Sequence, residues 1–226
     1  MKFLILSAAV LLIVQTGALA QVPPSATEEA GYRGLHAAAA QGDVALIRQL
    51  AGDGADLEAR DGAGRTALHV AAFKSHDAAL EALVTAGADI NALEHAAYDV
   101  ITIAAVADDL ELLTRALNLG GNPANITSPY EGTALIAAAH LGHAEVVSAL
   151  VEAGAPLDHV NNLGWTALIE VVVLGDGGPR HRQAARALLA GGADRTIADR
   201  QGVTPLQHAE QAGYGEMVAL FKEMAR

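Results

Sequence analysis

The stretch that decides the fold is residues 66–72, Thr-Ala-Leu-His-Val-Ala-Ala, because related segments recur along the whole chain. Each copy has a central aliphatic residue, and successive central residues are 33, 33, 34, 33 and 38 positions apart: Leu35, Leu68, Ile101, Leu135, Leu168 and Leu206. A glycine that closes an apolar run follows the first four of them by 19 residues and the fifth by 24. A fixed period of this length is the signature of stacked structural repeats.

Each unit predicts two short antiparallel helices. Apolar residues at helical spacing, such as Leu80, Leu83 and Val84, mark the second helix. The recurring glycine is suited to end that helix in the left-handed conformation. Polar turns such as residues 88–91 then lead to the next unit and predict a projecting finger. Residues suited to N-capping precede five of the first helices: Thr66, Asp99, Thr133, Thr166 and Thr204.

The core motif, the Gly-His turn at 142–143 and the Gly-Ala-Asp-x-Asn end at 87–91 resemble the ankyrin repeat. The resemblance implies an all-α solenoid of about six helix-turn-helix repeats, whose fingers and first helices line a concave face. It also implies that His36 and His69 make hydrogen bonds between repeats. After a short linker at 21–29, the domain would cover 30–226, with repeats near 30–60, 61–93, 94–126, 127–160, 161–198 and 199–226.

The N-terminus has the pattern of a cleaved signal peptide. Lys2 precedes an apolar run over residues 3–14, and the small residues of Ala18-Leu19-Ala20, the two alanines, predict cleavage between Ala20 and Gln21. The run is too short to span a bilayer, so a retained membrane anchor is the weaker alternative. Without any cysteine the chain has neither disulfides nor a lipid-modified cysteine. We therefore expect a periplasmic or secreted protein with no stable membrane anchoring after cleavage.

The charge balance narrows the class of partner. The net charge is −12, and loss of Lys2 with residues 1–20 would make it −13. Nucleic acids and anionic membranes require clustered basic residues, so we expect neither as a partner. A basic protein would be attracted to this surface, although the acidity is equally explained as a device that keeps a monomer soluble.

Motifs for catalysis and for cofactors are missing from the sequence. It has no nucleophile elbow, phosphate-binding loop or His-Glu-x-x-His pattern. His140 and His143 are three residues apart, but no cysteine or carboxylate cluster completes a zinc site beside them. We expect no catalytic residues, no metal and no cofactor, so the chain is not expected to be an enzyme or a metal-binding protein.

The aromatic residues point to a binding surface. Tyr32, Tyr98 and Trp165 each precede a first-helix cap, and Arg65 holds the same place in the second unit. The resemblance puts these positions on the concave face, where Tyr, Trp and Arg are typical of interface hot spots. The alternative is that a bulky residue before the cap simply packs on the neighbouring finger. The other predicted partner contacts are Phe73, Lys74, Tyr130 on an enlarged finger, and His140.

The fifth unit carries five extra residues within 174–182. Their Gly-Asp-Gly-Gly-Pro-Arg sequence predicts a flexible protrusion with Asp176 and Arg180 at its tip, which would be a further partner contact. Together these features predict an exported interaction module that supports or protects an envelope protein. The alternative is an immunity or inhibitor protein that neutralises a toxin or an enzyme.

Overall fold

The computed structural model describes residues 21–224, so the predicted signal peptide lies outside the described residues. A short helix α2 (Ala26–Gly31) precedes six helix pairs. The pairs are α3 (Gly34–Gln41) and α4 (Val44–Gly52), α5 (Ala67–Phe73) and α6 (Asp77–Thr85), α7 (Val100–Ala107) and α8 (Leu110–Asn118), α9 (Ala134–Leu141) and α10 (Ala144–Glu152), α11 (Ala167–Val173) and α12 (Pro179–Ala190), and α13 (Pro205–Ala212) and α14 (Gly215–Glu223).

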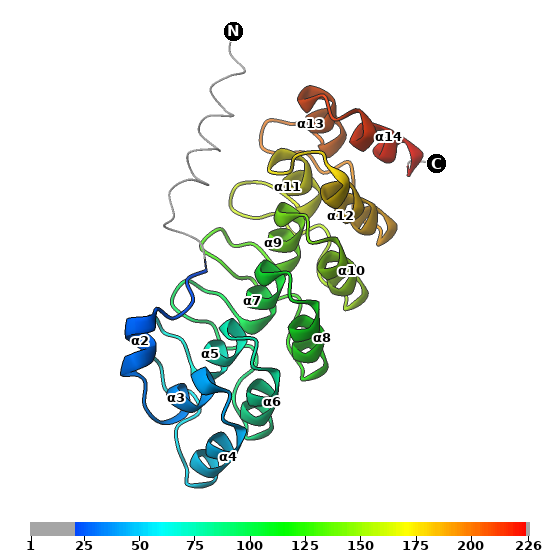
Figure 1. The fold of residues 1–226 in the computed structure, drawn as a ribbon. Helices are drawn as coiled ribbons and strands as arrows, with labels where there is room; N and C mark the ends of the chain where they lie inside the picture. The colour runs from blue at the N-terminus through cyan, green and yellow to red at the C-terminus, as the bar shows by residue number, and fades with distance from the viewer. Residues whose placement is uncertain (1–20, 225–226) are drawn as a thin grey trace.

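The pairs stack in chain order into a curved array (Figure 1). The first helix of each pair lies with the connecting fingers on the concave side; these are the odd-numbered helices from α3 to α13. The second helix of each pair lies on the convex side; these are the even-numbered helices from α4 to α14. Over residues 21–224 the β pairing amounts to one isolated antiparallel bridge between Thr127 and Gly132, in the enlarged finger. The predicted all-α solenoid is therefore confirmed.

Local sequence explains where the helices begin and end. The side chains of Asp99, Thr133 and Thr166 accept a hydrogen bond from the backbone N–H three residues ahead, as expected of N-caps. After the second helices the chain turns through glycines with positive φ, for example +110° at Gly87 and +82° at Gly154. A residue with a Cβ would be strained there, which accounts for the recurring glycine.

Small aliphatic residues make the core. The paired alanines of the first helices, such as Ala71 and Ala72, are at most 2% exposed and let neighbouring helices approach closely. In the fifth repeat Val171 and Val172 replace the alanine pair and are equally buried. One continuous apolar cluster runs from Leu35 to Phe221, so the stability of the array comes from burial between successive repeats.

The five extra residues of the fifth repeat do not form the predicted flexible protrusion. They lengthen α12, which has 12 residues where α10 has nine, and they shape a tight turn before it. The hydroxyl of Tyr214 in the last repeat donates to the carbonyl oxygen of Gly175 over 3.0 Å. A Cβ on Gly177 would lie 2.5 Å from the Tyr214 ring, so the turn is packed closely against the next repeat.

Candidate functional site

Two histidines join neighbouring repeats. His36 bonds through Nε2 to the carbonyl oxygen of Arg65 over 2.9 Å, and His69 bonds in the same way to that of Tyr98 over 3.2 Å. The Nδ1 atom of His69 lies 2.9 Å from the Thr66 hydroxyl, and burial lowers the pKa of this imidazole. The predicted hydrogen bonds between repeats are confirmed, so these histidines are structural.

The chain's own N-terminal segment, residues 21–31, covers the first part of the concave face; we call this segment the arm. Its helix α2 lies beside α3 and α5 on the concave side (Figure 1). Arg65 pairs with the Glu28 carboxylate of the arm and donates to the carbonyl oxygen of Val22 over 3.1 Å. Arg65 is consequently 1% exposed. The expectation that Arg65 lies open to a partner is wrong for this structure, because tertiary contacts with the arm bury it.

Asp61 holds the other side of Arg65. Its Oδ2 accepts hydrogen bonds from Arg65 Nε over 2.7 Å and from the Tyr32 hydroxyl over 2.6 Å. Burial by itself would raise the pKa of Asp61, but hydrogen bonds from Tyr32, Arg65 and the Ala63 backbone outweigh it and lower the pKa to about 2. Burial and the bond to Asp61 raise the pKa of Tyr32. Tyr32, a predicted partner contact, is thus partly buried and already engaged.

Phe73 and Lys74 lie at the far end of α5. The Lys74 ammonium group pairs with the Glu29 carboxylate of the arm over 2.9 Å, and the two side chains remain 34% and 27% exposed. Phe73 is partly buried and packs against the apolar core. Both ends of α5 are therefore in contact with the arm through ion pairs.

Tyr98 does not lie on the open surface. It is 6% exposed, and burial raises the pKa of its hydroxyl. The expectation that Tyr98 is accessible to a partner is wrong, because the side chain is buried. Its burial agrees with the alternative, in which a bulky residue before the cap serves in packing.

The remaining predicted aromatic contacts belong to the fourth and fifth repeats. Tyr130 on the enlarged finger and Trp165 before α11 are partly exposed, as is His140 near the end of α9. The backbone fixes both aromatic positions: the Tyr130 carbonyl accepts from the Asn162 N–H over 2.9 Å, and the Trp165 N–H donates to Asn161 Oδ1 over 3.0 Å. These residues form the open part of the concave face.

A buried carboxyl group lies on α11 in this part of the face, and sequence reasoning missed it. Glu170 is 4% exposed; Asn161 donates to its Oε1 over 2.7 Å, and its Oε2 lies 3.7 Å from His140 Nδ1. Burial raises the pKa of Glu170 to about 8 against the effect of the Asn161 bond, and burial also lowers the pKa of His140. The available signal was an acidic residue where other repeats carry Ala37, Val70, Ile103, Ala137 and His208.

The predicted contacts at the start of α12 are also held internally. Arg180 pairs with Asp108 over 2.7 Å, and its Nε donates to the carbonyl oxygen of Gly142 over 3.3 Å. Asp176 lies 2.8 Å from His181 Nδ1, and hydrogen bonds from the Gly178 backbone and from His181 lower its pKa. Both side chains remain exposed, but contacts with neighbouring repeats hold the segment that carries them.

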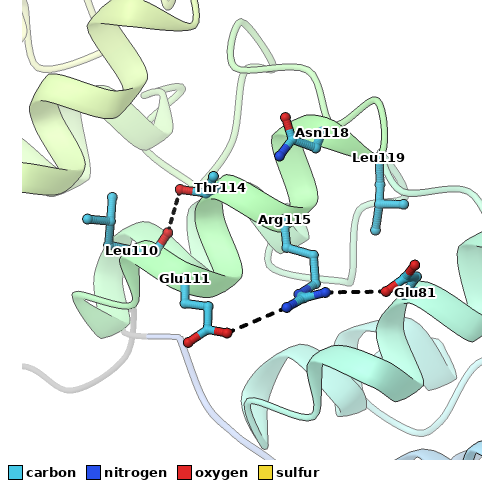
Figure 2. Close-up of a pocket in the computed structure, with 7 residues that line it drawn as sticks. All are labelled: Glu81, Leu110, Glu111, Thr114, Arg115, Asn118 and Leu119. Atoms are coloured by element: carbon cyan, nitrogen blue, oxygen red, sulfur yellow. Dashed lines mark hydrogen bonds and ion pairs between the residues drawn. The ribbon is translucent and has the colours of Figure 1, made fainter.

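The convex side has a shallow groove of about 650 Å³ along α8. Figure 2 shows Arg115 at its centre, between Glu81 of α6 and Glu111 of α8, over 3.2 and 3.5 Å. The same guanidinium lies 3.4 Å from Asp77. Since carboxylates from both helices already hold Arg115, we interpret this groove as a seam between two repeats.

Between residues 21 and 224, no three histidine or carboxylate side chains converge in a way that could hold a metal ion. None of the helices α2 to α14 has the length and apolar character needed to cross a bilayer.

Comparisons with known proteins agree with the geometry. A family model described as ankyrin repeats (3 copies) matches residues 6–94 and 101–195. The putative ankyrin repeat protein YahD of Escherichia coli (strain K12) is 33% identical over 114 residues, which are 50% of this chain and 56% of that protein. The chain thus spans little more than half the length of this curated relative.

Solved structures extend the likeness over most of the chain. An ankyrin repeat domain from Acinetobacter baumannii AYE is 41% identical with a TM-score of 0.79, covering 84% of this chain and 97% of that one. The ankyrin repeat domain of Bcl-3, described as a unique member of the IkappaB protein family, is 26% identical with a TM-score of 0.75, covering 85% and 86%.

Proposed function

The chain belongs to the ankyrin-repeat family, and from this premise we propose that it is an exported protein that binds another protein through its concave face. Ankyrin repeats are protein-interaction modules, and such solenoids use extended concave surfaces for binding. The observation that carries the proposal is the open part of this face, where Tyr130 and Trp165 remain partly exposed beside α9 and α11. Tyrosine and tryptophan are enriched among the residues that dominate binding energy.

Export is proposed from the sequence of residues 1–20. The short positive start, the apolar run and the small residues before Gln21 support removal of this segment during secretion. N-terminal sequencing of the protein recovered from the cell envelope or the medium tests this. We expect the chain to begin at Gln21; a chain that retains Met1 and fractionates with the cytoplasm would contradict export.

The proposed role is a monomeric, non-catalytic scaffold or protective factor for an envelope protein. A second role, inhibition of a toxin or an enzyme, is favoured by the net charge of −12, because a basic target would be attracted to an acidic surface. Adding the purified protein to its partner separates the two: a scaffold preserves the partner's activity and an inhibitor abolishes it. If charge attraction contributes, association slows as the salt concentration rises.

Site-specific photo-crosslinking in the cell tests the binding surface itself. A photoreactive amino acid is placed at Tyr130 or Trp165 on the concave side, and at the exposed Glu145 or Glu152 on α10 as matched convex controls. We expect one common protein adduct from the concave positions and none from the convex ones. The same adduct from α10, or adducts from α10 alone, would refute the assignment.

A further inference from the structure

We propose that the part of the concave face covered by the arm is a binding site for an acidic segment of a partner protein, and that the arm is its intramolecular occupant. The inference rests on the proposed function, since it specifies the chemistry that one part of the same face recognises. It follows from the charges beneath the arm, from how the arm is held, and from the state of the site below it.

Two basic side chains mark the ends of α5 on this part of the face. Arg65 lies two residues before the first residue of α5, and Lys74 follows its last, in a chain whose net charge is −12. Consecutive carboxylates of α2 meet them: Glu28 pairs with Arg65 and Glu29 with Lys74. The ligand that this surface accepts is therefore a short segment with adjacent acidic residues.

The arm is attached mainly by polar contacts. Helix α2 has six residues and buries none of them, and Pro24 is the one buried residue of the segment 21–31. Burial of apolar area is what fixes most elements of a fold. The Glu29–Lys74 pair is open to solvent and contributes little, and in the Glu28–Arg65 pair the Glu28 carboxylate remains 43% exposed. A segment held in this way can be displaced by a competitor that offers the same carboxylates and adds apolar contacts.

The site beneath the arm is preorganised by residues outside it. Asp61 accepts from Arg65 Nε over 2.7 Å, and it also accepts the backbone N–H groups of Ala63 and Arg65 over 2.9 Å each. This arrangement holds the guanidinium in place and leaves its terminal nitrogens for the Glu28 carboxylate and the Val22 carbonyl. An arginine fixed by one carboxylate and presented to a second is suited to recognise an incoming acid.

A peptide of residues 21–33 with capped ends and a fluorescent label serves as the probe, titrated against the intact protein. We expect it to bind a Glu28→Gln/Glu29→Gln variant about tenfold more tightly than the wild type, because the variant's own arm competes less. Adding Lys74→Gln to that variant should weaken binding about threefold, as expected for a partly exposed ion pair. Arg115→Gln, which removes a carboxylate-bound arginine on the convex side, is the matched control and should leave binding unchanged.

The inference is overturned if the peptide binds the wild type and the variant equally, or binds neither. It is also overturned if a peptide with both glutamates replaced by glutamine binds as well as the original. Failure here, with concave crosslinking intact, would leave the proposed function standing and remove the acidic site. Loss of concave crosslinking with normal peptide exchange would instead reject the proposed function.

Discussion

Replacing Glu170 by glutamine should stabilise the protein much more at pH 8 than at pH 5. Glutamine has the shape of the protonated acid, and its side-chain oxygen can still accept the hydrogen bond that Asn161 donates over 2.7 Å. The variant therefore removes the cost of a buried charge without removing the packing around it. Glu170 is suited to the test because it is 4% exposed and its ion-pair partner, the imidazole of His140, is charged only when protonated.

The size of the effect follows from the pKa. Burial raises the pKa of Glu170 from 4.5 to about 8, so the folded protein keeps a proton that the unfolded chain releases. Its free energy of unfolding therefore falls with rising pH between these values and levels off above pH 8. At about 1.4 kcal/mol per pH unit, the loss is ~1 kcal/mol at pH 5 and ~4 kcal/mol at pH 8. The glutamine variant should recover these amounts.

Urea unfolding at pH 5, 6.5 and 8, followed by the fluorescence of Trp165, gives the free energy of unfolding that tests this prediction. This residue is the chain's single tryptophan and lies five positions from Glu170, so it reports on the same repeat. Glu145→Gln, on the exposed surface of α10, is the matched control and should leave the pH dependence as it is. The reasoning would be refuted if the free energy of unfolding of the Glu170→Gln variant fell between pH 5 and 8 as steeply as that of the wild type.

Two further substitutions test how the repeats are joined. His69→Ala should lower the free energy of unfolding by about 2–3 kcal/mol, because it removes a fully buried side chain together with its hydrogen bonds to the Tyr98 carbonyl and to Thr66. His95→Ala, at an exposed position, is the control and should change the free energy of unfolding by less than about 0.5 kcal/mol. Equal effects of the two substitutions in urea unfolding would reject the structural role of His69. Gly177→Ala should cost at least ~1 kcal/mol, since φ is +67° and the added Cβ would lie 2.5 Å from Tyr214. An unchanged midpoint of thermal unfolding would contradict the packing of that turn.

The repeat architecture could be predicted because its determinants are local. A capping residue such as Thr133, a left-handed glycine such as Gly154 and a fixed period each constrain the backbone independently of distant contacts. The hydrogen bonds of His36 and His69 are those that the resemblance to the ankyrin repeat implies. These features agree in most units, so one sequence was enough to define the stack.

The state of the binding face could not be predicted in the same way. Whether Arg65 is open depends on the arm, whose Glu28 lies 37 residues from Arg65 in the sequence, and a local pattern carries no information about contacts over that separation. Glycine-rich composition suggested a flexible protrusion near Asp176, but Tyr214 of the following repeat packs on that turn. Glu170 was overlooked because an isolated acidic residue on a helix normally faces solvent.

The most direct test of the account is the affinity of the partner, once crosslinking has identified it, for two double variants. Isothermal titration calorimetry would compare Tyr130→Ala/Trp165→Ala on the concave face with Glu111→Gln/Glu145→Gln on the convex helices. Loss of two hot-spot aromatics should weaken binding about 100-fold or more, whereas the convex variant should change it less than about twofold. Equal affinities for the wild type and the concave variant, with the fold intact by circular dichroism, would contradict the claim that this face binds the partner.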